Sequence, residues 1–326
     1  MGFFGKNKGG RETAIRIFYA SDIHGTEVLW RKFLNAAEAY NADVLVMGGD
    51  LTGKAVVPLV EDGDGYTADL FEKRQKVSGK EAVSELERKI RGKGMYPHRM
   101  NRNEVDKVSA MNEEEREKWF AVVMLETFNS WLDLAGERLA GQDVHCYVMP
   151  GNDDPPGVEE AIVEAAGVEA CDGLVVEFEG YSMISLGYSN PTPFDSPREL
   201  SEDEIIRRID EMAAQVPDLS RCIFNLHVPP YDSRLDTAPE LDQELNVIMA
   251  GSEPRMGPVG STAVRSAIEK HQPLLALHGH VHESAGATRI GRTLCINPGS
   301  DYHTGRISGC FLSLRGDDVK HQFVNA

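Results

Sequence analysis

The chain has 326 residues with 34 basic and 52 acidic side chains, so its formal net charge is −18. This balance argues against a general nucleic-acid binder, whose affinity comes from Lys and Arg side chains that neutralise phosphates. Hydrophobic residues make up 41% of the chain and the mean hydropathy is −0.34, values typical of a globular protein and not of a disordered one. No apolar run approaches the roughly 18 residues of a membrane helix, so we expect no membrane span.

The cysteine pattern indicates a reducing compartment. The five cysteines are scattered, odd in number and without a CxxC pair, which predicts free thiols that are mostly buried. The N-terminus has no apolar run long enough for a secretory signal, and a cytoplasmic location is therefore expected. Residues 1–13 are rich in Gly and Lys and predict a frayed end.

The first fifty residues predict a βαβ unit. An apolar run at 14–20 predicts a buried strand, apolar residues at helical spacing predict a helix over 27–40, and 44–47 predicts a second strand. This order implies parallel pairing in an α/β fold. The segments 174–186 and 293–314 have the pattern of hairpins, so a mixed sheet is expected. Further strands are predicted at 144–149, 174–178, 182–186, 222–226, 274–277, 293–296 and 310–314.

Residues 52–140 interrupt this alternation, because a βα connection is usually only a few residues long. The sequence from Asp62 to Gly65 predicts a hairpin turn, and a helix is predicted over 80–91. A longer helix is predicted from Asn112, where Glu115 completes a capping box. We expect an inserted hairpin and helical cap that packs on the core and shapes the pocket.

Side chains of metal-ligand type follow five of the predicted strands. Ligands bind at the carboxyl ends of strands in α/β sheets, so these side chains are expected to converge. Taken singly, each has an ordinary explanation, because Asp and Asn often form turns or caps and a lone His is usually structural. Chance would have to place a residue of metal-ligand type after five separate strands, so a common site is the better explanation. In chain order the candidates are Asp22, His24, Asp50, Asn152, His227, His280 and His282.

This mixture of donors suits two divalent ions acting on a phosphate. Two ions about 3.5–4 Å apart hold the attacking and leaving oxygens of an in-line displacement, and a shared water loses a proton to become a metal-bridging hydroxide that attacks. One bridging carboxylate screens the repulsion between the ions, while imidazoles and an amide complete the shells without cancelling the positive charge. The donor set favours Mn, Fe or Zn over Ca and does not choose among them.

The ordered set resembles the calcineurin-like metallophosphoesterase superfamily, over about 14–50 and 144–304 but not over the insertion. The resemblance implies a mixed β-sandwich flanked by helices. We expect a single domain over 1–326, with a largely helical insertion at 52–140. The resemblance also implies a dinuclear metal-dependent phosphohydrolase that cleaves a small phosphodiester or phosphomonoester, with Asp50, Asn152 and His227 catalytic. Carried over residue by residue, it implies one ion on Asp22, His24 and His282, a second on Asn152, His227 and His280, and Asp50 as the bridge.

Two departures from the family pattern bear on the substrate. Many members have a His that contacts the phosphate where this chain has Asp153. Because an anion there repels a phosphate, we expect Asp153 to point elsewhere or to have a raised pKa, which puts monoester hydrolysis in doubt. His303 is a candidate proton donor; the alternative is an ordinary surface histidine. Residues 51–53 lack the Asp-Arg-Gly of the Ser/Thr protein phosphatases, and a protein substrate is not expected.

Two other functions stay open: a nuclease on the same scaffold, and a catalytically weak metal-binding scaffold module. The acidic balance disfavours the nuclease, and the seven intact ligand positions disfavour the scaffold module. The basic segment 88–102 either grips a remote phosphate or carboxylate of the substrate or is the solvated end of a helix and its loop. Substrate, metal identity and assembly into a homo-oligomer are not determined by the sequence.

Overall fold

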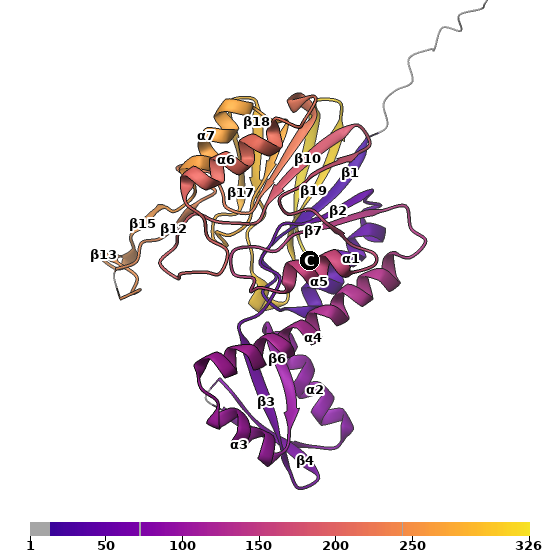
Figure 1. Cartoon of the computed structure of the whole chain (residues 1–326), viewed down its shortest axis with the longest axis vertical. Helices are drawn as coiled ribbons and strands as arrows, with labels where there is room; N and C mark the ends of the chain where they lie inside the picture. The colour runs from indigo at the N-terminus through magenta and orange to yellow at the C-terminus, as the bar shows by residue number, and fades with distance from the viewer. Residues whose placement is uncertain (1–13, 72, 243) are drawn as a thin grey trace, which may run out of the picture.

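Two six-stranded mixed sheets form the body of the molecule (Figure 1), in a computed structural model that describes residues 14–71, 73–242 and 244–326. The predicted frayed segment 1–13 lies outside the described residues. The first sheet has the order β20 (Asp318–Asn325), β19 (Ser308–Arg315), β1 (Ile15–Ala20), β2 (Val44–Met47), β7 (His145–Val148), β8 (Glu169–Ala170). The second has the order β17 (Gly286–Ile290), β18 (Thr293–Asn297), β16 (Leu275–Leu277), β11 (Cys222–Leu226), β10 (Tyr181–Leu186), β9 (Val175–Phe178).

The two sheets pack face to face because alternate side chains of each strand point to opposite faces. Ile17 and Tyr19 of β1 belong to the same buried cluster as Ile223 of β11 and Leu275 of β16. Their neighbours along the strands, such as Phe18, point to the outer faces and pack under helices. This arrangement explains why the central strands β2 and β16 are apolar along their whole length.

Helices cover both outer faces of the sandwich. On the first sheet lie α1 (Glu27–Ala39), α4 (Glu113–Leu139) and α5 (Val158–Glu164), and on the second lie α6 (Glu202–Ala213) and α7 (Thr262–His271). The predicted α/β class and the mixed sandwich flanked by helices are confirmed.

One of the two predicted hairpins is wrong. β9 and β10 pair antiparallel, as expected for 174–186. The segment 293–314 is not a hairpin, because β18 pairs with β16 and β17 in the second sheet while β19 pairs with β1 and β20 in the first. Its connecting loop therefore crosses from one sheet to the other, which the strand patterns alone do not reveal.

The segment between β2 and β7, apart from α4, projects from the lower end of the sandwich in Figure 1. The hairpin turn from Asp62 to Gly65, the helix α2 (Lys80–Arg91) and the capping box of Asn112 and Glu115 on α4 are confirmed. The sequence did not predict the four-stranded sheet, in which β3 pairs parallel with β6. Its further elements are β3 (Ala55–Asp62), β4 (Gly65–Leu70), β5 (Lys73–Ser78), β6 (Met95–Met100) and α3 (Arg102–Ala110).

An arm of short strands joins β11 to α7 and leaves the sandwich on the left of Figure 1. It was not predicted, since two- and three-residue strands carry no readable hydrophobic period. Its strands are β12 (Thr237–Pro239), β13 (Met249–Ala250), β14 (Glu253–Pro254) and β15 (Met256–Pro258). Within the described part of the chain, no helix has the length and hydropathy needed to span a membrane.

All five cysteines are free and buried, which yields a direct test of the core. Burial raises the pKa of Cys222, Cys295 and Cys310 to about 12, so the reactive thiolate is scarce at neutral pH. We expect no thiol to react with a thiol-specific disulfide reagent in the native protein, and all five to react in guanidinium chloride. Rapid reaction of a thiol in the native protein would contradict this core.

Candidate metal centre

The seven predicted ligands converge at one edge of the sandwich. β1, β2 and β7 run parallel, and so do β11 and β16, so the turns that follow them emerge at the same end. Asp22, His24 and His282 place ligand atoms within 4.8 Å of one another, and Asp50, His227 and His280 do the same. These are groups of side chains that could hold a metal ion, one beside the other.

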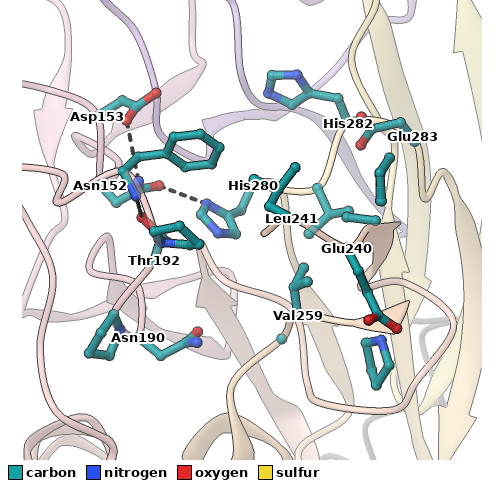
Figure 2. Close-up of a pocket in the computed structure, with 18 of the residues that line it drawn as sticks. Asn152, Asp153, Asn190, Thr192, Glu240, Leu241, Val259, His280, His282 and Glu283 are labelled. Carbon is teal, nitrogen blue, oxygen red and sulfur yellow. Dashed lines mark hydrogen bonds between the residues drawn. The ribbon is translucent and has the colours of Figure 1, made fainter. Parts of the chain in front are cut away.

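Asn152 joins the second group through its amide oxygen. Its Oδ1 lies 2.7 Å from Nδ1 of His280 and 3.1 Å from Nε2 of His227, and Figure 2 shows the Asn152 and His280 side chains pointing toward each other. A neutral oxygen and two imidazole nitrogens that approach one point match the donors of a divalent transition metal.

Asp50 lies between the two groups. Its Oδ2 is 3.7 Å from Nε2 of His24, in the first group, and 3.4 Å from Nε2 of His227, in the second. Its other oxygen, Oδ1, accepts a hydrogen bond of 3.0 Å from the backbone N–H of Asp153. This bond fixes the carboxylate so that one oxygen faces both groups of ligands.

Backbone contacts orient the other ligands. Nδ1 of His227 lies 2.8 Å from the carbonyl oxygen of Gly48; when Nδ1 carries the proton and donates to that carbonyl, Nε2 is free as a ligand. The Asp22 carboxylate accepts from the backbone N–H of His280, at 3.0 and 3.1 Å. The turn that carries His280 is thus tied to the first ligand of the chain.

Four ligands occupy a strained backbone conformation. The φ angles of Asp22, His24, Asp50 and His280 are 57°, 39°, 51° and 66°, in the left-handed region that costs most residues about 1–3 kcal/mol each. Such strain persists only where the surrounding structure over-determines it. The turns that carry these four side chains are therefore held in place by the contacts around them.

Two glycines beside the ligands allow the close approach of the turns. A Cβ at Gly151 would lie 2.1 Å from Oδ1 of Asp50, and one at Gly279 would lie 2.3 Å from Oδ2 of Asp22. Each glycine therefore has no substitute, because any side chain would displace a carboxylate.

Carboxylates and imidazoles shift one another's pKa values. Burial by itself raises the pKa of Asp50, but the charge of His227 and the hydrogen bond to it hold that pKa far below its usual range. Although burial opposes it, Asp50 in turn raises the pKa of His227 to about 10. Burial and the positive charge of His227 lower the pKa of His280 to about 4. The carboxylates are thus held in the anionic form that a cation requires.

Asp154 and His278 support the site and were missed as supports by the sequence analysis. Asp154 is fully buried and accepts hydrogen bonds from the backbone N–H groups of Leu51, Thr52 and Gly151. It thereby locks the turn of Asp50 to the turn of Asn152. His278 is also fully buried, and its Nδ1 lies 2.9 and 3.2 Å from the carbonyls on either side of His227. The sequence signal for such supporting residues is only their position next to the motif of a candidate ligand.

Asp153 does not point away from the site. It has an oxygen within 4.8 Å of ligand atoms of His24 and Asp50. Its carboxylate pairs with Lys54 at 2.5 Å and accepts a hydrogen bond of 2.9 Å from the Ser196 hydroxyl. The expectation that it points elsewhere is wrong, because Lys54 supplies a positive charge that offsets part of the charge of Asp153.

His303 lies at the margin of the candidate site. It is in the short helix η2 (Tyr302–Thr304), its side chain is 67% exposed, and its Nε2 pairs with Asp301 at 3.1 Å. Its backbone carbonyl accepts from Lys93, and it is not among the residues that line the cavity. The geometry corresponds to the surface-loop alternative and gives no support to proton donation.

A cavity of about 830 Å³ opens beside the ligands and is walled mainly by the loop after β10 and by the arm between β11 and α7. From the segment 52–140 only Lys54 appears among the described lining residues, so the expectation that the insertion shapes the pocket is corrected. Within the basic segment 88–102, Arg91 pairs with Glu27 and Arg99 with Glu87. This pairing corresponds to the solvated-helix alternative.

Because Asp154 holds two turns together, a small change in its side chain should lower the free energy of unfolding. In Asp154→Asn an amide N–H₂ replaces one of the oxygens that face N–H donors, and we expect the free energy of unfolding to fall by about 2–3 kcal/mol. Urea unfolding of the metal-free protein measures this. The exposed Asp64→Asn in the β3–β4 turn is the matched control, with an expected change within about 0.5 kcal/mol. Equal midpoints for the two variants would contradict the lock.

Comparisons with known proteins show which structures and sequences this chain is similar to. No family model matches the chain. A solved crystal structure aligns with a TM-score of 0.55 at 17% identity, covering 95% of this chain and 99% of the other, and thus shares its fold. The structure of TT1561 from Thermus thermophilus aligns with a TM-score of 0.49 at 14% identity, over 95% of this chain and 99% of that one.

A sequence relative establishes the family. Uncharacterized protein MJ1162 of Methanocaldococcus jannaschii is 30% identical to this chain over 167 residues, which are 50% of this chain and 68% of the relative. At this identity and coverage, the chain belongs to the same family as MJ1162.

Proposed function

We propose that this protein is a member of the calcineurin-like metallophosphoesterase superfamily and a dinuclear metal-dependent phosphohydrolase that cleaves a small phosphodiester. The observation that carries the proposal is the position of Asp50, whose Oδ2 faces His24 of one ligand group and His227 of the other. A single carboxylate that faces histidines of two neighbouring groups is the arrangement that two neighbouring cations need.

The donor set fits two divalent ions of the Mn, Fe or Zn type. Asp22, His24 and His282 would hold one ion, Asn152, His227 and His280 the other, and Asp50 both. Bound there, the ions would supply Lewis acidity to the phosphoryl oxygens and lower the pKa of water toward neutrality. Only two of the seven ligands are anionic, so the loaded site keeps a positive charge that attracts a phosphate.

The chain's own residues would keep two of the candidate ligands in place and leave room beside them for the ester. The Asn152 amide is neutral and leaves the charge of the site intact, and the contact with Gly48 keeps the His227 ring in place. The cavity beside them provides room for the substrate.

The five buried free cysteines support the cytoplasmic location that the sequence predicts.

A diester is favoured over a monoester because Asp153 adds a negative charge close to His24 and Asp50. A phosphomonoester carries two negative charges near neutral pH and a diester carries one. Repulsion by Asp153 is therefore greater for the monoester, and its pairing with Lys54 offsets only part of this charge.

Asp50→Asn tests the proposal at its centre. The change keeps the shape of the side chain but removes the charge that both ligand groups share. We expect manganese-dependent hydrolysis of bis(4-nitrophenyl) phosphate to fall below detection, while the circular dichroism spectrum stays that of the parent protein. Metal analysis should give two ions per chain in the parent and fewer in the variant. Unchanged turnover in Asp50→Asn would refute the assignment, and a metal-loaded parent that cleaves no ester would favour the scaffold alternative.

Asp153→Asn tests the preference for a diester. Without the carboxylate, the ratio of kcat/KM for 4-nitrophenyl phosphate to that for bis(4-nitrophenyl) phosphate should rise about tenfold, because one unit of repulsion is removed. Lys54→Gln is the matched opposite change: it leaves Asp153 uncompensated and should lower the same ratio. If neither variant changes the ratio, the charge of Asp153 does not select the substrate.

A further inference from the structure

The wall of the cavity differs in chemistry from the metal centre beside it. Apolar side chains predominate on the loop after β10 and on the arm between β11 and α7. Figure 2 shows Leu241 and Val259 on the His280 side of the cavity, with Asn190 and Thr192 across from them. The apolar side chains used in the argument are Pro193, Phe194, Tyr231, Leu241, Val247 and Val259.

Several of these side chains are exposed although they are large and apolar. Phe194 is 63% exposed, Val247 43% and Tyr231 40%. They come from two segments far apart in the sequence and meet around one cavity that also contains Asn152 and His280. Contiguous apolar surface of this kind beside a polar site is typical of a ligand pocket.

The charges of the wall restrict what the rest of the ligand can be. Among the described lining residues Lys54 is the one Lys or Arg side chain, and Asp153 already pairs with it. Glu240 also lines the cavity and pairs with Arg255, while Glu283 lines it as an exposed carboxylate. A second phosphate on the substrate would therefore meet carboxylates and no free cation.

We propose that this cavity takes a phosphodiester with a single negative charge, one of whose ester arms is an aromatic or other apolar group that packs on Phe194, Leu241 and Val259. The inference rests on the proposed function and extends it to the substrate class. The phosphate lies at the ligand groups of the metal centre, and the apolar arm extends away from them along the wall. Apolar area removed from water supplies the affinity of the arm.

Binding of two phosphinates tests the apolar arm without catalysis. Diphenylphosphinate and dimethylphosphinate both carry one negative charge and have carbon–phosphorus bonds that cannot be hydrolysed, so they differ only in the arms. Titration calorimetry of the manganese-loaded protein should show tighter binding of diphenylphosphinate by about tenfold or more. Leu241→Ala and Phe194→Ala should each reduce this difference several-fold and leave the affinity for dimethylphosphinate unchanged.

The controls are apolar side chains of the same type outside the cavity lining. Leu174 is 49% exposed and Phe71 is 65% exposed, and Leu174→Ala and Phe71→Ala should leave both affinities unchanged. A chromogenic nucleoside phosphodiester with and without a second phosphate tests the charge, and the added phosphate should raise KM. Equal affinities for the two phosphinates, or a lower KM with the added phosphate, would overturn the inference.

The same measurements separate this inference from the proposed function. If diesters are hydrolysed and the two phosphinates bind equally, the function stands and the apolar arm is refuted. If diphenylphosphinate binds more tightly but no diester is cleaved, the pocket is supported and the hydrolytic function fails.

Discussion

Burial of three neighbouring carboxylates is the constraint on which the site depends. Asp22, Asp50 and Asp154 are almost completely buried. Burial and, after it, the charge of Asp50 raise the pKa of Asp154, whereas neighbouring imidazoles hold the pKa of Asp22 and of Asp50 below its usual value although burial opposes this. Such a cluster is stable only when positive charge or N–H donors compensate each member. Imidazoles compensate Asp22 and Asp50, and backbone N–H groups of two turns surround Asp154. The donors that stabilise the fold are thus the groups that prepare a centre for cations.

The same constraint explains the local backbone. Carboxylates can share neighbours only if the turns that carry them approach closely, and this requires Gly151 and Gly279 at the contacts. It also forces Asp22, Asp50 and His280 into the left-handed region. The free energy stored there is offset by the apolar sandwich below, whose rigid parallel strands hold the turns in place.

The sandwich and the irregular segments around it contribute different parts of the site. The sandwich positions the ligand groups, while the wall of the cavity comes from irregular segments after β10 and β11. Loops on a rigid scaffold commonly determine specificity. The segment between β2 and β7 contributes Lys54 at its beginning, and Tyr96 of β6 accepts a hydrogen bond from Gly53 next to it. The segment is therefore anchored to the site without forming the wall of its cavity.

The sequence by itself determined most strands of the sandwich and the identity of the candidate ligands, because buried strands read as apolar runs and the candidate ligands follow such runs. It did not predict β8, β17 and β20, whose side chains are mostly not buried. It also predicted the capping box of Asn112 and Glu115, whose bonds span three residues. Tertiary structure alone decided the pairing of β18 and β19 in different sheets, the parallel contact of β3 with β6, the Lys54–Asp153 pair and the meeting of Phe194 with Leu241 at one cavity. These features join residues far apart in the chain through contacts that leave no periodic pattern in the sequence, so only the folded chain could reveal them.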